Sequence, residues 1–143
     1  MRPDEKKQIK ELLTVVCSML NSRGGTLYVG VNNMGFAVGI EPDFDYLSKA
    51  PGRYDLTQMK DQYDLKFRNS VHDELGVIAN DLISSSFITV EGKTIYKVDV
   101  QPSKEIIYLD KIAYVRQSTS KWPVDSKKMA ELKAQRERMF SKN

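Results

Sequence analysis

The chain has 143 residues, 41% of them hydrophobic and 29% charged, which is typical of one globular domain spanning 1–143 and not of a disordered or fibrous protein. No apolar run approaches the ~20 residues of a membrane span, and the charged residues 1–10 are unlike a signal peptide, so we expect a cytoplasmic protein without a membrane partner. The net charge is only +3, but residues 121–143 hold seven Lys or Arg against three acids, a pattern typical either of nucleic-acid attraction or of a solvated helix face.

The first predicted element is an amphipathic helix over residues 4–22. Its apolar residues recur at helical spacing and are Ile9, Leu12, Leu13, Val16 and Leu20. Gly24 and Gly25 are expected to end the helix, because glycine readily adopts the left-handed conformation found at helix C-termini.

A strand is predicted next, at residues 26–32, because apolar and other residues alternate there. We expect the first helix to pack against it. Residues 32–35 indicate a turn that contains Gly35, and residues 36–40 a returning strand. Gly30 inside the first strand indicates that another chain segment approaches it closely.

The middle of the chain predicts one long helix and one hairpin. After a polar loop at residues 48–55, apolar residues recur every three or four positions over 56–75, which is typical of a helix. Residues 76–83 are ambiguous and compatible with a short helix. Residues 86–100 alternate on both sides of Glu91-Gly92 and predict a hairpin.

The last third of the chain predicts a second strand pair and a helix. The strand pair covers residues 105–116 and turns at Asp110-Lys111, and residues 117–123 read as a polar loop. A final helix is expected at about 125–140, with Asp125 as its N-cap. This order of elements predicts an α+β fold in which helices pack on a mixed, mostly antiparallel sheet.

The glycine-rich segment contains part of the glycine pattern of a phosphate-binding loop. Gly25 and Gly30 have the spacing of a P-loop, but Val31-Asn32 stands where that loop needs Lys and Ser or Thr, and the helix precedes the strand instead of following it. We therefore interpret Gly24, Gly25, Gly30 and Gly35 as structural turn residues and expect no nucleotide cofactor.

The other chemically reactive residues give little indication of a site. Cys17 lies on the apolar face of the first predicted helix and is interpreted as a buried free thiol. A zinc site built from Cys17 and the single histidine, His72, would lack ligands. We expect no metal and no catalytic residue.

Two blocks of the sequence together resemble the Schlafen AlbA domain family, formerly described as divergent AAA proteins. Family members show A-N-T-x-G-G at the end of a helix, then a strand with G-V-D-D-x-G, and later S-x-x-x-P-x-Y and Y-V-R-x-G-S-S-T. The matching positions in the first block are Asn21, Gly24, Gly25, Gly30, Val31, Gly35 and Gly39. Those in the second block are Ser103, Tyr108, Tyr114, Val115, Arg116, Ser118 and Thr119. The resemblance covers nearly the whole chain and implies a nucleic-acid-binding domain.

The chain departs from the family pattern at the residues that would carry catalysis. In ribonuclease members, the resemblance implies two acids from an E-x-x-x-x-E-F-K segment and one from the second Asp of the G-V-D-D turn. Such carboxylates would hold a divalent metal. Asn32-Asn33 replaces the two aspartates, and the E-F-K segment is not visible. We therefore expect no metal-dependent nuclease activity.

The candidate binding residues surround the end of the Y-V-R strand. We expect Arg116, Ser118, Thr119 and Lys121, aided by Arg23 and Lys104, to contact phosphates, because arginine forms paired hydrogen bonds with a phosphate and hydroxyls commonly contact phosphate oxygens. The structural alternative is that Arg116 pairs with an acid such as Asp99 and that the hydroxyls cap a turn.

The sequence thus favours a non-catalytic nucleic-acid-binding module, for DNA or RNA, as part of a transcriptional regulator. One alternative is a domain for protein interaction or self-association, and a homodimer is expected on the resemblance to larger, two-lobed family members. Further alternatives are a metal-dependent ribonuclease and an ATP-binding protein.

Overall fold

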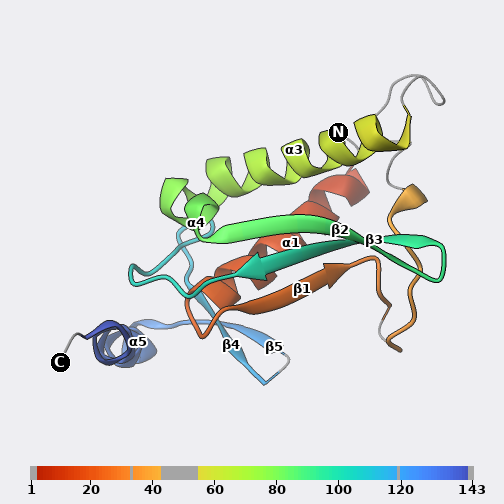
Figure 1. Cartoon of the computed structure of the whole chain (residues 1–143). Coiled ribbons are helices and arrows are strands. Elements are labelled where there is room, and N and C mark those ends of the chain that lie inside the picture. The colour runs from red at the N-terminus through yellow and green to blue at the C-terminus, as the bar shows by residue number, and fades with distance from the viewer. Residues whose placement is uncertain (1–2, 33, 43–54, 119, 142–143) are drawn as a thin grey trace.

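The computed structural model describes residues 3–32, 34–42, 55–118 and 120–141. Its elements, in chain order, are α1 (Pro3–Leu20), β1 (Gly25–Val29), α3 (Leu56–Leu75), α4 (Val77–Asp81), β2 (Ile83–Val90), β3 (Lys93–Val100), β4 (Tyr114–Gln117), β5 (Ser120–Pro123) and α5 (Ser126–Phe140) (Figure 1). The predicted α+β class is confirmed. Except for Asp55, the polar loop predicted at 48–55 lies outside the described residues.

The strands form two antiparallel sheets. In the three-stranded sheet β3 is central, and its Val100 lies opposite Gly25 of β1 on one side and Ile83 of β2 on the other. Strands β4 and β5 form a separate hairpin, which Figure 1 shows beside the turn between α1 and β1. Among the described strands every pairing is antiparallel, so the sheets are not mixed.

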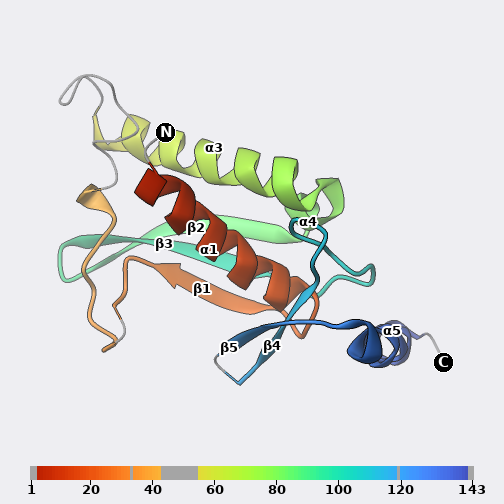
Figure 2. The same cartoon turned by 180° about the vertical axis from the view of Figure 1, so that it is seen from behind.

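One hydrophobic core joins α1 and α3 to the three-stranded sheet, and Figure 2 shows α1 lying across that sheet beside α3. The fully buried Tyr96 of β3 is its largest side chain. Its ring packs edge-on against Tyr63 and Phe67 of α3, and its hydroxyl donates a hydrogen bond to Asp64 (2.5 Å). The apolar face predicted for α1 lines the same core as Leu27 of β1.

Helix α1 ends at a turn that requires glycine. Gly24 has φ +70° and donates its N–H to the Met19 carbonyl (2.9 Å), which satisfies one free acceptor at the helix terminus. A Cβ at position 24 would lie 2.3 Å from the Val100 carbonyl oxygen. The turn is therefore fixed both by backbone conformation and by close contact with β3.

Three predicted elements agree closely with the structure. Helix α3 has the predicted bounds, because Asp55 and Gln58 form a reciprocal capping box at its start and Gly76 follows its end. The hairpin at Glu91-Gly92 is present, although β2 already begins at Ile83. The final helix has Asp125 as its N-cap, with the carboxylate accepting from Lys128 N–H (2.8 Å).

Two predicted strand regions were wrong. Residues 36–40 form no strand and contribute only an isolated bridge between Val31 and Ala37, because the Gly30 carbonyl accepts both the Val38 N–H (2.7 Å) and the Gly39 N–H (2.9 Å) and the regular ladder stops there. Asn32 Oδ1 accepts from the N–H groups of Met34 and Phe36 (both 3.0 Å) and holds a tight turn. Gly35 lies within this turn and donates its N–H to the Asn32 carbonyl (3.0 Å).

In the predicted strand pair at 105–116 the two halves meet only in a single bridge between Leu109 and Ile112, around the predicted Asp110-Lys111 turn, and only the end of the second half forms a strand, β4. Backbone groups of the first half bond elsewhere: Ile107 N–H, for example, donates to Asn21 Oδ1 (2.8 Å). The predicted polar loop at 117–123 instead contains β5, the true partner of β4.

The sequence interpretation of Cys17 is confirmed. The side chain is fully buried and unpaired by any disulfide, and burial raises the pKa of the thiol to about 11. Within the described ranges, every helix is too short or too polar to cross a membrane.

Candidate nucleic-acid interface

The β4-β5 hairpin brings two cations together on one face. Arg116 of β4 lies directly opposite Lys121 of β5, and directly opposed residues of an antiparallel pair point to the same side of the sheet. Arg116 is half-buried and Lys121 is exposed. Like charges in this arrangement destabilise a sheet, so a bound anion would relieve a repulsion that is built into the fold.

Asp99, the acid considered above as a partner for Arg116, has other partners. Asp99 accepts a hydrogen bond from the Thr26 hydroxyl (2.8 Å) and lies 3.8 Å from Lys97 Nζ. Over the part of the chain that the structure describes, no ion pair joins Arg116 to a carboxylate. The structural alternative of an Arg116–Asp99 pair is therefore not found in the structure.

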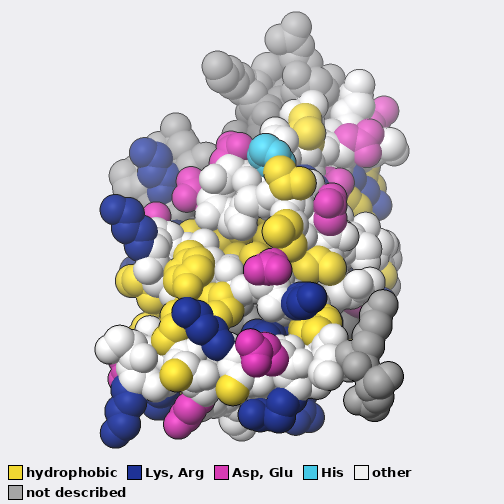
Figure 3. Space-filling model, turned by 90° about the vertical axis from the view of Figure 1, so that its left-hand side faces the viewer, with side chains coloured by type: hydrophobic (Ala, Val, Ile, Leu, Met, Phe, Trp, Pro, Cys, Tyr) yellow, Lys and Arg dark blue, Asp and Glu magenta, His cyan; other side chains and the backbone are white. Residues whose placement is uncertain are grey.

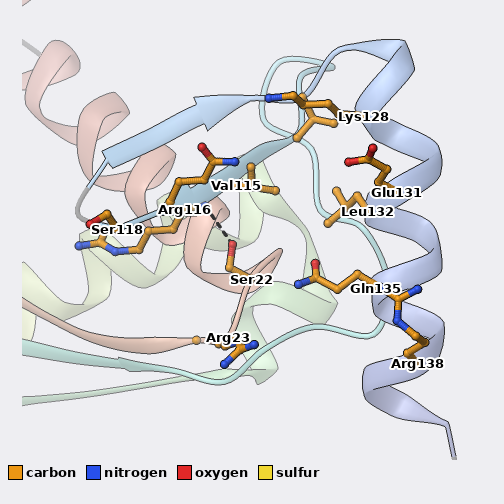
Figure 4. Close-up of a pocket in the computed structure, with 13 residues that line it drawn as sticks. Ser22, Arg23, Val115, Arg116, Ser118, Lys128, Glu131, Leu132, Gln135 and Arg138 are labelled. Atoms are coloured by element: carbon orange, nitrogen blue, oxygen red, sulfur yellow. Dashed lines mark hydrogen bonds between the residues drawn. The ribbon is translucent and has the colours of Figure 1, made fainter.

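A buried asparagine fixes the hairpin to the end of α1. Asn21 Nδ2 donates to the carbonyls of Ile107 (2.8 Å) and Tyr114 (2.9 Å). The next residue, Ser22, accepts the Arg116 N–H through its hydroxyl (2.9 Å), as the dashed line in Figure 4 shows. Because Asn21 is fully buried, its role is to position β4, and the match of this residue to the family motif has a structural reason.

A pocket of ≈ 460 Å³ opens between the turn after α1, strand β4 and helix α5. Figure 4 shows Lys128, Glu131, Leu132, Gln135 and Arg138 along α5 on one side of it, and Arg116 and Ser118 on the other. Its charged lining consists of four cations and one carboxylate, namely Arg23, Arg116, Lys128, Arg138 and Glu131. The pocket is therefore a basic site.

Figure 3 shows one side of the molecule, on which Lys and Arg side chains lie along the lower edge and also at the centre and upper left, with Asp and Glu among them. Hydrophobic side chains are exposed between these charges. On this face the basic side chains are interrupted by acidic and hydrophobic ones and do not form a continuous stripe.

Arg136 of α5 binds the C-terminus of α1 and is not part of the pocket lining. It is 3% exposed, and its guanidinium donates to the carbonyls of Asn21 (2.8 Å), Ser22 (2.7 Å) and Leu20 (3.3 Å), and to that of Ser103 (3.0 Å). Burial lowers the pKa of Arg136 from its usual value. A cation at a helix C-terminus offsets the negative end of the helix dipole, which would otherwise repel an anion in the pocket.

The structure brings some of the predicted residues together. Arg23, Arg116 and Ser118 line the pocket, and Lys121 lies opposite Arg116 on the hairpin. Lys104 is exposed and is not part of the lining. Thr119 lies outside the described residues.

Sequence reasoning missed the contribution of α5. Lys128, Gln135 and Arg138 line the pocket, whereas the sequence indicated only a concentration of positive charge after residue 120. Arg136 could have been noticed, because it lies one helical turn after Leu132 and one before Phe140, inside an otherwise apolar stripe.

The turn that would carry family acids has a different role in this chain. Asn32 Oδ1 is used to hold the turn, as described above, and Asn33 lies outside the described residues. Across the described ranges, no three His, Cys, Asp or Glu side chains are grouped closely enough to hold a metal ion.

Fold and site together define an α+β domain with a basic hairpin and pocket at one end. Residues 2–125 match the family described as Schlafen, AlbA_2, so the chain belongs to that family and the resemblance seen in the sequence is confirmed. All of α5 lies beyond the matched residues.

The comparison with solved structures supports the fold. The DIP2311 protein from Corynebacterium diphtheriae superimposes with a TM-score of 0.66 at 21% identity, over 99% of this chain and 24% of that one. This chain thus spans about a quarter of the length of that protein, and the likeness at such identity shows the fold alone. A comparison with curated proteins gives no match.

Proposed function

We propose that the chain is a non-catalytic nucleic-acid-binding module that contacts phosphates through the β4-β5 hairpin and the rim of the neighbouring pocket. The observation that carries the proposal is the opposed pair Arg116 and Lys121, which has no neutralising carboxylate among the described residues. Membership of a Schlafen AlbA family is consistent with this function.

The chemistry favours contact with the backbone over sequence readout. Arg116 can grip one phosphate through two hydrogen bonds, and Ser118 offers a hydroxyl at the hairpin turn. Arg23 extends the same basic surface, and Thr119 and Lys104 are proposed as further contacts. Backbone binding of this kind is weak and depends strongly on salt.

The test is fluorescence anisotropy of labelled RNA and DNA across a salt series. We expect a Kd of about micromolar or weaker at physiological salt, and a decrease of log K with log salt of about one unit per neutralised phosphate. The double substitution Arg116→Ala/Lys121→Ala should weaken binding to every sequence about equally and flatten the slope by about two units.

A matched control removes two charges elsewhere. Lys6 and Lys7 are exposed on the first turns of α1, and roughly 20 Å of helix separates them from Ser22 at the pocket. Lys6→Ala/Lys7→Ala should leave affinity and slope nearly unchanged. Absence of binding at low salt, or equal effects of the two double substitutions, would contradict the proposal.

The absence of catalysis is part of this proposal. The family resemblance assigns one metal-binding acid to position 33, where this chain has Asn, and a neutral amide binds a divalent cation more weakly than a carboxylate. Manganese-dependent cleavage of labelled tRNA, abolished by Asn33→Ala, would overturn the non-catalytic assignment.

Self-association is a second candidate function, favoured by an exposed apolar turn. Val31, Met34, Phe36 and Val38 are 39%, 79%, 61% and 50% exposed, and they follow the edge strand β1. Apolar side chains grouped in this way often mark an interface. We therefore propose a homodimer through this turn, and a monomeric mass by light scattering at high protein concentration would exclude it.

We also propose that the nucleic-acid-binding module is part of a cytoplasmic regulator of transcription.

A further inference from the structure

The pocket beside the β4-β5 hairpin combines an apolar floor, amide side chains and a basic rim. Its apolar lining is Val115, Val124 and Leu132, and its amides are Gln117 and Gln135. We propose that this pocket binds one unpaired nucleotide of a single strand, with the base on the floor and its phosphate at the rim. The proposal rests on the proposed function and adds to it a preference for single-stranded nucleic acid.

The size and lining of the pocket fit one nucleotide. A volume of ≈ 460 Å³ lies within the ~300–1,000 Å³ range of small-molecule sites. A base has two flat apolar faces and a polar edge. The floor contributed by Val115 and Leu132 suits a face, and the amides of Gln117 and Gln135 can both donate to and accept from an edge.

The charges around the pocket fit the phosphate of the same nucleotide. Arg23 lies after α1 on one side of the pocket, and Lys128 and Arg138 lie along α5 on the other, with the single carboxylate of Glu131 between them, whereas the Arg116 side chain extends toward Ser118 (Figure 4). The carbonyls at the end of α1 would repel a phosphate, but the guanidinium of Arg136 is bonded to three of them. An anion can therefore approach this helix terminus.

An exposed tryptophan supplies a second, independent observation. Trp122 of β5 is 52% exposed and lies directly opposite Val115, so both project from the same face of the hairpin, and the next pair, Arg116 and Lys121, projects from the other face. An exposed aromatic ring beside a basic pocket is the arrangement on which bases of single strands stack. Trp122 can thus hold the base adjacent to the one in the pocket.

A duplex fits this arrangement poorly. Its bases are paired and stacked, and a base enters a protein pocket only after it has been extruded from the stack. A duplex can therefore reach only the cations of the rim and the hairpin, whereas an unpaired strand can use the rim, the pocket and Trp122 together.

The experiment compares a labelled 12-nucleotide single strand with the duplex of the same sequence, by anisotropy at one salt concentration. Trp122 is the only tryptophan in the chain, so quenching of its fluorescence reports stacking directly. We expect tighter binding of the single strand, with quenching that the duplex does not produce. Trp122→Ala should weaken single-strand binding about five- to a hundredfold and leave duplex binding unchanged.

Gln135→Ala tests the pocket separately from the stacking ring, and it should also weaken single-strand binding alone. Because Trp122 is half-exposed and Gln135 lies at the pocket, thermal unfolding of each variant serves as the check that it folds. Arg116→Ala/Lys121→Ala, by contrast, should weaken single-strand and duplex binding alike.

The outcomes separate this inference from the proposed function. If wild-type protein binds both forms equally and neither Trp122→Ala nor Gln135→Ala changes the ratio, the inference is wrong while backbone binding stands. If neither form binds, the proposed function itself is wrong. If AMP or UMP displaces the strand at micromolar concentration, the pocket is a site for free nucleotides and the single-strand assignment is overturned.

Discussion

Replacing Arg136 with alanine would test how the C-terminal helix is attached to the domain. The guanidinium makes four hydrogen bonds of 2.7–3.3 Å to backbone carbonyls, and the side chain is 3% exposed. A hydrogen bond from a charged donor contributes about 1.5–3 kcal/mol to stability. The four bonds share one group, however, and their contributions do not add in full.

Two opposing effects reduce the expected loss. Removing Arg136 also removes the cost of burying its charge, and water entering from the pocket can hydrate the outermost carbonyl. We expect Arg136→Ala to lower the free energy of unfolding by about 3 kcal/mol, which corresponds to a decrease in Tm of about 10 °C for a chain of this size.

The measurement is thermal and urea unfolding followed by circular dichroism. Arg138→Ala, two residues along the same helix, is the matched control, because Arg138 is exposed and its loss should cost less than about 0.5 kcal/mol. Arg136→Lys keeps the charge but not the planar arrangement of donors, so its Tm should lie between those of Arg136→Ala and Arg138→Ala. A Tm for Arg136→Ala within about 2 °C of that of Arg138→Ala would refute the reasoning, because the network would then contribute nothing measurable.

Two further predictions concern the turn after α1 and the buried thiol. Gly24→Ala should destabilise the domain more than Gly35→Ala, since both have positive φ but only a Cβ at position 24 meets a backbone oxygen, Val100 O, at 2.3 Å; equal midpoints in urea would show that the contact has no cost. Burial raises the pKa of Cys17 from 9.0 to about 11, so its contribution to stability should be complete below pH 9 and lost as the pH rises toward 11. At pH 8 the thiol should react with a disulfide reagent only in denaturant, and fast labelling of the native protein would contradict this burial.

The sequence predicted elements whose signals are local. Helix α3 was predicted with its bounds, because the apolar repeat runs from the N-cap Asp55 to Gly76 without interruption. The β2-β3 hairpin followed from alternation on both sides of Glu91-Gly92, a turn that both residues occupy with positive φ. In such segments the periodicity, the caps and the turn residues all indicate the same structure.

Elements defined by distant partners were not predictable in this way. All four residues of β5 are exposed, so the strand lacks the alternating burial that would mark it in the sequence, and it is defined by its pairing with β4. Residues 106–109 form an apolar run typical of a strand, yet Ile107 bonds to the buried Asn21, 86 residues earlier in the chain. In the sequence Asn21 is indistinguishable from an ordinary residue at a helix end, and its burial and long-range hydrogen bonds are apparent only in the folded structure.

The candidate site was predicted in part for the same reason. The sequence predicted Arg23, Arg116 and Ser118 because they lie beside the end of the first helix or at the end of the Y-V-R strand. The structure places all three around one pocket. Lys128, Gln135 and Arg138 join them only because Arg136 and Leu132 orient α5, and a basic helix face in the sequence does not reveal which residues it will meet.

The attachment of α5 through Arg136 also bears on the order in which the domain folds. The bond between Arg136 and the Asn21 carbonyl joins residues 115 positions apart, so closing it costs more chain entropy than the local contacts within α3 or the β2-β3 hairpin. During synthesis, α1 and the sheet emerge from the ribosome well before residue 136 does, and domains begin to fold from the N-terminal side. The nascent chain can therefore assemble its core while the end of α1 still exposes bare carbonyls, and the basic pocket comes into existence only when α5 arrives to cover them.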